Sequence, residues 1–139
     1  MSRASVQIEI PLPPEGCGPN TYRHWTKKSA AARTYREEAH LLARAAHSGP
    51  PFDEPVIVSC EWFMGKTAAQ KLGADRRYRP LDTANAIASL KAAIDGIVDA
   101  GVLTGDSHKH LSWGRTILHR AAKEHGGRSC VVLTFEADR

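Results

Sequence analysis

The sequence predicts an α+β fold: a small mixed β-sheet with two main helices packed on it. Two kinds of segment predict this fold. Short segments alternate apolar and polar residues, as half-buried strands do, and two longer segments repeat apolar residues every three or four positions, as helices do. At 139 residues the chain has the length of one ordinary domain, and we expect a single domain over residues 1–139.

The first strand and the first helix are predicted from their periodicity. Val6, Ile8 and Ile10 alternate with polar residues, and Pro11 ends this half-buried strand. An alanine-rich helix is expected from Ser29, which can cap it, to about residue 47. Its predicted buried stripe consists of Tyr35, Ala39, Leu42 and Ala46.

Residues 20–28, between these two elements, are predicted to form a loop that mixes cations with aromatic side chains. Such a mixture can hold phosphates and stack on exposed bases. A solvated loop anchored by Trp25 explains the aromatic residues nearly as well. The candidates for phosphate contacts are Arg23, Lys27 and Lys28.

A second strand is expected over residues 56–63, followed by a long polar loop over residues 64–80. Val56, Val58, Cys60 and Trp62 share one face of the strand, and Cys60 is expected to be a small buried residue. The loop's basic residues are the main candidates for contacts with a DNA backbone, although a flexible charged loop is the plain alternative. They are Lys66, Lys71, Arg76, Arg77 and Arg79.

The segment over residues 82–101 is predicted to be the central helix. Asp82 can cap its start, and Gly101 ends it. Its apolar stripe consists of Ile87, Leu90, Ile94, Ile97 and Val98. At about 100° per residue, a second group falls within an arc of about 120° beside that stripe. This group is Asn85, Lys91, Asp95 and Asp99.

Short carboxylates near both ends of this helix, joined by Asp106 in the next loop, suit an oxygen-liganded hard cation such as Mg²⁺. An equally good interpretation needs no metal. Asp82 is then only a helix cap, Asp95 an ion-pair partner of Lys91, and Asp99 a solvated residue.

Two further strands are expected over residues 111–118 and 129–136. The turn between them, at residues 124–127, favours an antiparallel hairpin whose apolar face carries Val131, Leu133 and Phe135. Upstream, His108 and His110 are two residues apart and lack a clear third ligand. We therefore interpret them as part of a solvated loop rather than as a metal site.

Composition limits the classes of protein. The net charge of +4 and a pI of about 9.2 favour a polyanionic partner without requiring one. Three widely separated cysteines argue against a disulfide framework and against a structural zinc site. No segment approaches the roughly 18 apolar residues of a membrane span, and the N-terminus does not read as a signal peptide. We expect a soluble cytoplasmic protein.

The central segment resembles the RusA family of Holliday junction resolvases, common in bacteria and their phages. The family pattern is Asp-x-Asp-Asn before a helix that carries a Lys, then Asp followed by Gly or Ala, a Gly, and an Asp-Asp pair. The matching positions are Asp82, Asn85, Lys91, Asp95, Gly96, Gly101 and Asp106, and the spacing from Lys91 to Asp106 fits without a gap. Ala84 and Gly105 stand where the family has aspartates. The start of the chain, a strand entering a Pro-Pro loop followed by Asn20, is also similar.

The resemblance implies a RusA-like crossover junction endodeoxyribonuclease that acts as a homodimer on four-way DNA junctions, in a bacterial or phage-infected cell. With Asp82, Asp95 and Asp106 as ligands of Mg²⁺ (or Mn²⁺), Lys91 would stabilise the transition state and Asn85 would orient a ligand. One alternative is a catalytically weak or inactive branched-DNA-binding protein of the same fold. Another is a small metal-dependent hydrolase of nucleotides.

Overall fold

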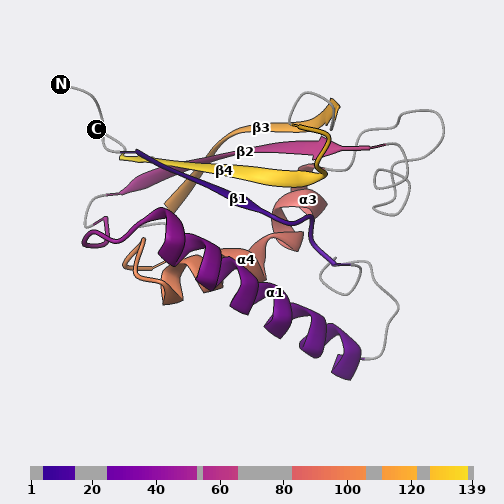
Figure 1. Cartoon of the computed structure of the whole chain (residues 1–139), viewed down its shortest axis with the longest axis horizontal. Helices are drawn as coiled ribbons and strands as arrows, with labels where there is room; N and C mark the ends of the chain where they lie inside the picture. Colours follow the sequence, from indigo (N-terminus) through magenta and orange to yellow (C-terminus); the bar gives the residue numbers. More distant parts are fainter. Residues whose placement is uncertain are drawn as a thin grey trace.

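In the part of the chain that the structure describes, four strands form one mixed sheet, and three helices lie on one of its faces (Figure 1). The computed structural model describes residues 5–14, 25–52, 55–65, 83–105, 111–121 and 126–137, with the backbone alone for 25–28, 83–85 and 118–121. The elements in chain order are β1 (Ser5–Ile10), α1 (Trp25–Ala46), β2 (Val56–Met64), α3 (Thr83–Ser89), α4 (Lys91–Asp99), β3 (Leu111–Ala121) and β4 (Cys130–Ala137). The predicted α+β class is confirmed.

The strand order is β1-β4-β2-β3, so the predicted hairpin between the last two strands is wrong. β4 pairs antiparallel with both β1 and β2, whereas β3 pairs parallel with β2 at the end of the sheet order. The burial of the two strands explains why β4, and not β3, lies inside the sheet. Most residues of β4 are buried, as suits a strand bonded on both sides, whereas Ser112, Gly114 and Arg115 of β3 are exposed. A parallel pair also needs a crossover connection, in which α3 and α4 lie.

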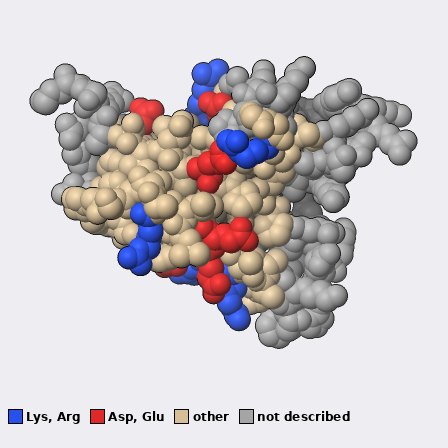
Figure 2. All heavy atoms as spheres, in the orientation of Figure 1, with Lys and Arg blue, Asp and Glu red and all other residues tan. Residues whose placement is uncertain are grey.

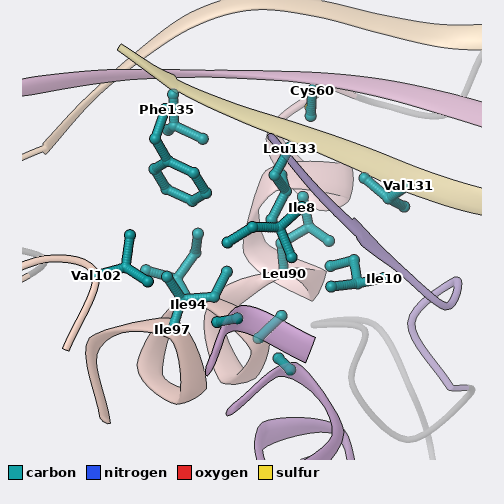
Figure 3. Packing of buried hydrophobic residues seen from close by; sticks show 14 of the residues in the cluster. Ile8, Ile10, Cys60, Leu90, Ile94, Ile97, Val102, Val131, Leu133 and Phe135 are labelled. Atoms are coloured by element: carbon teal, nitrogen blue, oxygen red, sulfur yellow. The ribbon is translucent and has the colours of Figure 1, made fainter. Parts of the chain in front are cut away.

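The core lies between the sheet and the helices, as Figure 3 shows. Alternating residues of three strands point into it, and the faces predicted for β1, β2 and β4 are confirmed. The buried sheet residues are Ile8, Ile10, Val56, Val58, Cys60, Trp62, Val131, Leu133 and Phe135. α4 contributes Ala93, Ile94 and Ile97, and Leu90 just before it is also fully buried. Tyr35 of α1 donates a hydrogen bond of 2.6 Å to the carbonyl oxygen of Pro11, which ties this helix to the end of β1.

α1 differs from its prediction at both its start and its buried face. It begins at Trp25, so Lys27 and Lys28 belong to its first turn and not to a loop. The buried residues follow a strict spacing of four, namely Tyr35, Ala39 and Ala43. Leu42 is 39% exposed and Ala46 is also exposed, which contradicts the prediction for these two positions. Two of the three residues in this stripe are alanines, which suit a helix that lies close to its neighbour.

The predicted central helix is interrupted at Leu90. The Leu90 amide donates to the carbonyl oxygen of Ile87, three residues back, and the Ser89 hydroxyl donates to that of Ala86. These local bonds end α3 before α4 begins at Lys91. Because Leu90 is fully buried, the interruption still directs the apolar stripe into the core.

Gly101 ends α4, as predicted. Its φ of +83° is a left-handed conformation that favours glycine. The Gly101 amide donates to the carbonyl oxygen of Val98, and the Val102 amide donates to that of Ile97. This pair of bonds is a Schellman motif, and the buried side chains of Val102 and Ile97 supply the apolar contact that often accompanies it.

α1 and α4 approach each other most closely at Gly96. A Cβ atom added there would lie 2.1 Å from the carbonyl oxygen of Arg36 and 3.1 Å from the amide nitrogen of His40. Both are backbone atoms of α1, so they cannot move aside as a flexible side chain would. Only glycine therefore fits at this position while the two helices keep this separation.

We predict that Gly96→Ala destabilises the protein by about 1–3 kcal/mol, because the steric cost exceeds the roughly 1 kcal/mol that alanine gains in a helix. Urea unfolding followed by circular dichroism measures the change. Gly49→Ala is the control, since its new Cβ would meet only the His47 ring at 3.5 Å. An alanine variant at position 96 that is as stable as the wild type would contradict the close approach.

Candidate functional site

The exposed face of α4 carries Lys91, Asp95 and Asp99, each four residues after the last, so their side chains follow one another along the helix. The Lys91 Nζ donates to Asp95 Oδ1 at 2.8 Å. Their side chains are 65% and 28% exposed. The sequence left two interpretations of Asp95 open, and the structure shows the ion pair with Lys91.

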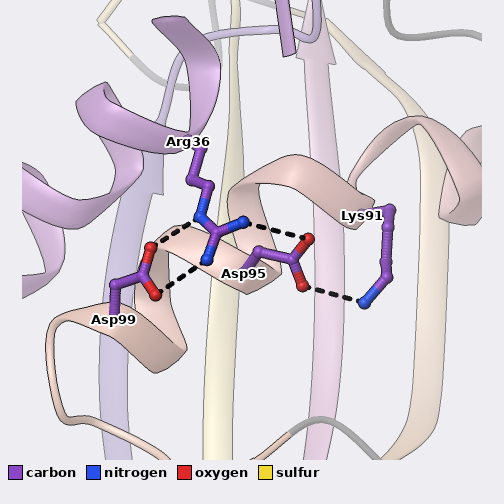
Figure 4. A network of polar contacts seen from close by, with 4 residues as sticks. All are labelled: Arg36, Lys91, Asp95 and Asp99. Carbon is purple, nitrogen blue, oxygen red and sulfur yellow. Dashed lines mark hydrogen bonds and ion pairs between the residues drawn. The ribbon is translucent and has the colours of Figure 1, made fainter. Parts of the chain in front are cut away.

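Arg36 of α1 joins this row from across the helix interface (Figure 4). Its guanidinium donates from Nε to Asp99 Oδ2 at 2.6 Å and from Nη2 to Asp99 Oδ1 at 2.9 Å. Its Nη1 lies 4.0 Å from Asp95 Oδ2. Asp95 therefore lies between two cations, and we refer to Lys91, Asp95, Arg36 and Asp99 together as the ion-pair row.

The close approach at Gly96 makes this row possible, because Arg36 is itself the residue whose carbonyl oxygen faces Gly96. A bidentate pair of a guanidinium and a carboxylate has strong geometric preferences, so it forms only where the two backbones have the right separation. The motif element Asp95-Gly96 thus has an explanation in helix packing: the glycine admits α1, and α1 brings Arg36 to the acids.

The row perturbs the ionisation of its members. The hydrogen bond from Arg36, and after it the charge of Arg36, hold the pKa of Asp99 below its ordinary value. The same pair raises the pKa of Arg36, again mainly through the hydrogen bond. Asp99 is therefore a carboxylate, and Arg36 a cation, throughout the neutral range.

A groove of about 230 Å³ lies beside the row, between the helices and β3. Lys91 belongs to both features. The described residues that line this groove, called the Trp113 groove below, are Ile87, Ala88, Lys91, Ile94, Leu111 and Trp113. Among these described lining residues, all except Lys91 are apolar.

Most of the predicted site residues fall outside the part of the chain that the structure describes. Those outside are Asp82, Asp106, Arg23, Lys66, Lys71, Arg76, Arg77 and Arg79, together with His108 and His110. Asn85, Lys27 and Lys28 are described by their backbone alone, Asn85 within α3 and the two lysines within α1. The two predicted catalytic residues whose side chains are described, Lys91 and Asp95, are brought together.

Sequence reasoning missed Arg36 and Trp113. The side chain of Arg36 is about half exposed. Its partner Asp99 is 63 residues away, and no periodicity within α1 or α4 indicates which faces meet. Trp113, in the third strand along the chain, could have been noted as an aromatic residue soon after the loop that carries Asp106.

The described residues alone do not form a metal centre: none of their histidines, cysteines and acids form a group of three or more. Asp95 offers the oxygen chemistry that Mg²⁺ prefers, and a site would need the carboxylates of Asp82 and Asp106 beside it. Cys60 is fully buried, and that burial raises the pKa of its thiol, which suits a core residue and not a nucleophile.

Charge is divided unevenly along the chain. The side chains that the structure describes include six lysines and arginines against seven aspartates and glutamates, a net charge of −1. The net charge of +4 of the whole chain therefore comes from the remaining side chains, which together carry +5 and include Lys27, Lys28 and Arg120. Figure 2 agrees for the face in view, where positive and negative side chains lie next to one another over the coloured surface.

In comparisons with known proteins, neither a protein-family model nor a curated protein sequence matches this chain. Within the described ranges, no helix has both the length and the apolar character that a membrane crossing requires.

We predict that Arg36→Met lowers the free energy of unfolding at pH 7, because it removes the partner that stabilises ionised Asp99. The folded-state pKa of Asp99 is lowered, so this stabilisation is present above the ordinary aspartate pKa of about 3.9 and is lost as the pH falls through the lowered value. Urea unfolding at a series of pH values should therefore show the wild type and the variant converging in acid.

Arg33→Met is the matched control, since Arg33 is an exposed arginine about one turn earlier on the same helix. The difference in free energy of unfolding between Arg33→Met and the wild type should change little over this acid range. The assignment of Arg36 as the group that stabilises ionised Asp99 would be contradicted by one result. That result is a difference in free energy of unfolding between Arg36→Met and the wild type that stays undiminished below the pKa of Asp99.

Proposed function

We propose that this protein is a metal-dependent endonuclease that resolves Holliday junctions and other branched DNA by paired symmetric nicks during recombination and repair. One observation carries the proposal. The residues from Lys91 to Asp106 keep the spacing of the RusA pattern, and the described members of that pattern have coherent positions on α4. Lys91 and Asp95 share its exposed face, Gly96 faces α1, and Gly101 ends the helix.

The proposed chemistry divides between a metal and the side chains. Asp82, Asp95 and Asp106 would hold Mg²⁺, or Mn²⁺, and such an ion supplies a water of lowered pKa and shields negative charge on phosphate oxygens. Lys91 would stabilise the added negative charge of the transition state through its ammonium group. Asn85 would orient a carboxylate by hydrogen bonding.

DNA would be held mainly by the segments that carry the positive charge, since the described body is close to neutral. The proposed phosphate contacts are Arg23, Lys27, Lys28, Lys66, Lys71, Arg76, Arg77 and Arg79. A four-way junction has near two-fold symmetry and must be cut on two strands, so a homodimer with one site per subunit fits this substrate. The proposed setting is the cytoplasm of a bacterium or of a phage-infected cell.

A second candidate function, binding to branched DNA without cleavage, is favoured by the ion-pair row. Asp95 already lies between Lys91 and Arg36, so a metal would have to compete with two cations for its carboxylate. Ala84 and Gly105 further reduce the number of carboxylates available, because each replaces an aspartate of the family pattern. This candidate keeps the fold and the DNA contacts but not the chemistry.

For the endonuclease, we predict symmetric nicking of a synthetic four-way DNA junction in Mg²⁺ or Mn²⁺, lost on addition of EDTA and lost in Asp106→Asn. A linear duplex of the same sequence is the control substrate. Binding of the junction without nicking in either metal, together with nicking gained by Ala84→Asp, would establish the binding-only candidate instead. Absence of any binding to branched DNA would contradict both.

We predict that Lys91→Met lowers the single-turnover rate of junction cleavage by about a hundredfold or more, the effect of removing one group that stabilises charge in a transition state. Junction affinity should change far less, because several other cations hold the backbone. Arg44→Met, which removes an exposed cation near the end of α1, should leave the rate unchanged. Equal rates for Lys91→Met and the wild type would remove Lys91 from the mechanism.

A further inference from the structure

We propose that the Trp113 groove binds one unstacked nucleobase, with the adjacent phosphate contacting Lys91. The inference builds on the proposed function, because it assigns the ligand to a strand of branched or single-stranded DNA. It concerns described residues only, and it adds a base contact to a site so far argued only from carboxylates and cations.

The walls of the groove have the chemistry that a base needs. Trp113 from β3 supplies an aromatic ring, and Ile87, Ile94 and Leu111 supply aliphatic surface. Stacking on an aromatic side chain tolerates any base, because every base has a π-face. The side chain of Trp113 is partly exposed while it also packs against the main core. It can therefore present a surface to a ligand from a fixed position.

The size of the groove limits the ligand. Its volume of about 230 Å³ is below the roughly 300–1,000 Å³ of sites for drug-sized molecules. The groove is thus suited to a single planar group and not to a peptide helix or a run of stacked bases. A base in a duplex or in a stacked strand would have to leave its neighbours to enter, which is easiest where strands exchange in a branched molecule.

The rim of the groove has the charge that a nucleotide requires. Lys91 is the single charged residue among the described lining residues, and its side chain is 65% exposed. An ammonium group has three N–H donors, so a phosphate oxygen can share Lys91 with Asp95.

The backbone beside Trp113 is irregular in a way that fixes the groove. The pairing of β2 with β3 runs from Val58–Trp113 to Cys60–Thr116, so β3 contains one extra residue just after Trp113. Such β-bulges increase local twist and redirect side chains. Gly114 lies in this bulge, and an added Cβ there would meet Ile57 Cγ2 at 2.6 Å. Glycine at this position therefore leaves room for the Ile57 side chain of the neighbouring strand.

The first test follows the indole N–H signals of the ¹⁵N-labelled protein during titration with a short oligothymidylate. The Trp113 signal, assigned by its loss in Trp113→Phe, should shift in a saturable manner. The signal of Trp62, which is 1% exposed, should stay in place and serve as the internal reference. A Trp113 signal that does not move at saturating DNA would overturn the proposal.

The second test measures affinity with variants of two groove residues, Trp113 and Ala88, and with a control variant elsewhere. Trp113→Phe keeps an aromatic ring and should keep most of the affinity for oligothymidylate, whereas Trp113→Ala should lower it by about tenfold or more, the effect of one lost stacking contact. Ala88→Glu places a negative charge at the groove without removing packing, since Ala88 is exposed. Ala45→Glu, on an exposed position of α1, makes the same change of net charge elsewhere.

Ala88→Glu should weaken oligothymidylate binding severalfold more than Ala45→Glu does, and equal effects of the two would overturn the base-binding groove. Junction binding is measured with the same proteins. If Trp113→Ala binds the junction normally and the Trp113 signal of the wild type does not move, the groove is not a base-binding site and the proposed function stands. If the Trp113 signal shifts but the protein neither binds nor cuts a junction, the groove is supported as a base-binding site and the proposed function is contradicted. Absence of binding to either DNA overturns both.

Discussion

The contact between α1 and α4 at Gly96 is the constraint on which the described functional features depend. Because a single hydrogen stands where another residue would have a Cβ, the backbones of the two helices approach until the carbonyl oxygen of Arg36 faces Gly96. This close approach decides which side chains of α1 can reach the acids of α4, and through Lys91 it fixes one rim of the Trp113 groove.

The electrostatics of α4 follow from that contact. Without Arg36, Asp95 and Asp99 would be two like charges one helical turn apart, which is unfavourable. With Arg36 bound to Asp99 and near Asp95, and with Lys91 bound to Asp95, the row contains two cations and two anions. A balanced row is stable as a surface feature by itself. The proposed metal chemistry therefore requires Asp95 to exchange a partner, whereas the binding-only function requires no change in the row.

The charge distribution favours different roles in binding for the described body and for the rest of the chain. The described side chains together are nearly neutral, and the other parts of the chain, which include residues 25–28 and 118–121, carry the positive charge and most of the motif acids. A polyanion would thus be attracted by those parts, over distances set by ionic strength. The body would contribute rigid short-range contacts: the Lys91 ammonium and the apolar groove beside it.

Sequence alone determined the buried faces of three strands and the end of the central helix, because the faces of Ile8–Ile10, Val56–Trp62 and Val131–Phe135 follow from local alternation and Gly101 favours a helix end. It also singled out Lys91 and Asp95 by spacing. Only the tertiary structure decided the strand order, in which β2 separates the strands expected to form a hairpin, and the pairing of Arg36 with Asp99. The physical reason is common to both. Periodicity shows which face of an element is apolar, but the partner of that face depends on how closely distant backbones can approach, and here a buried glycine set that distance.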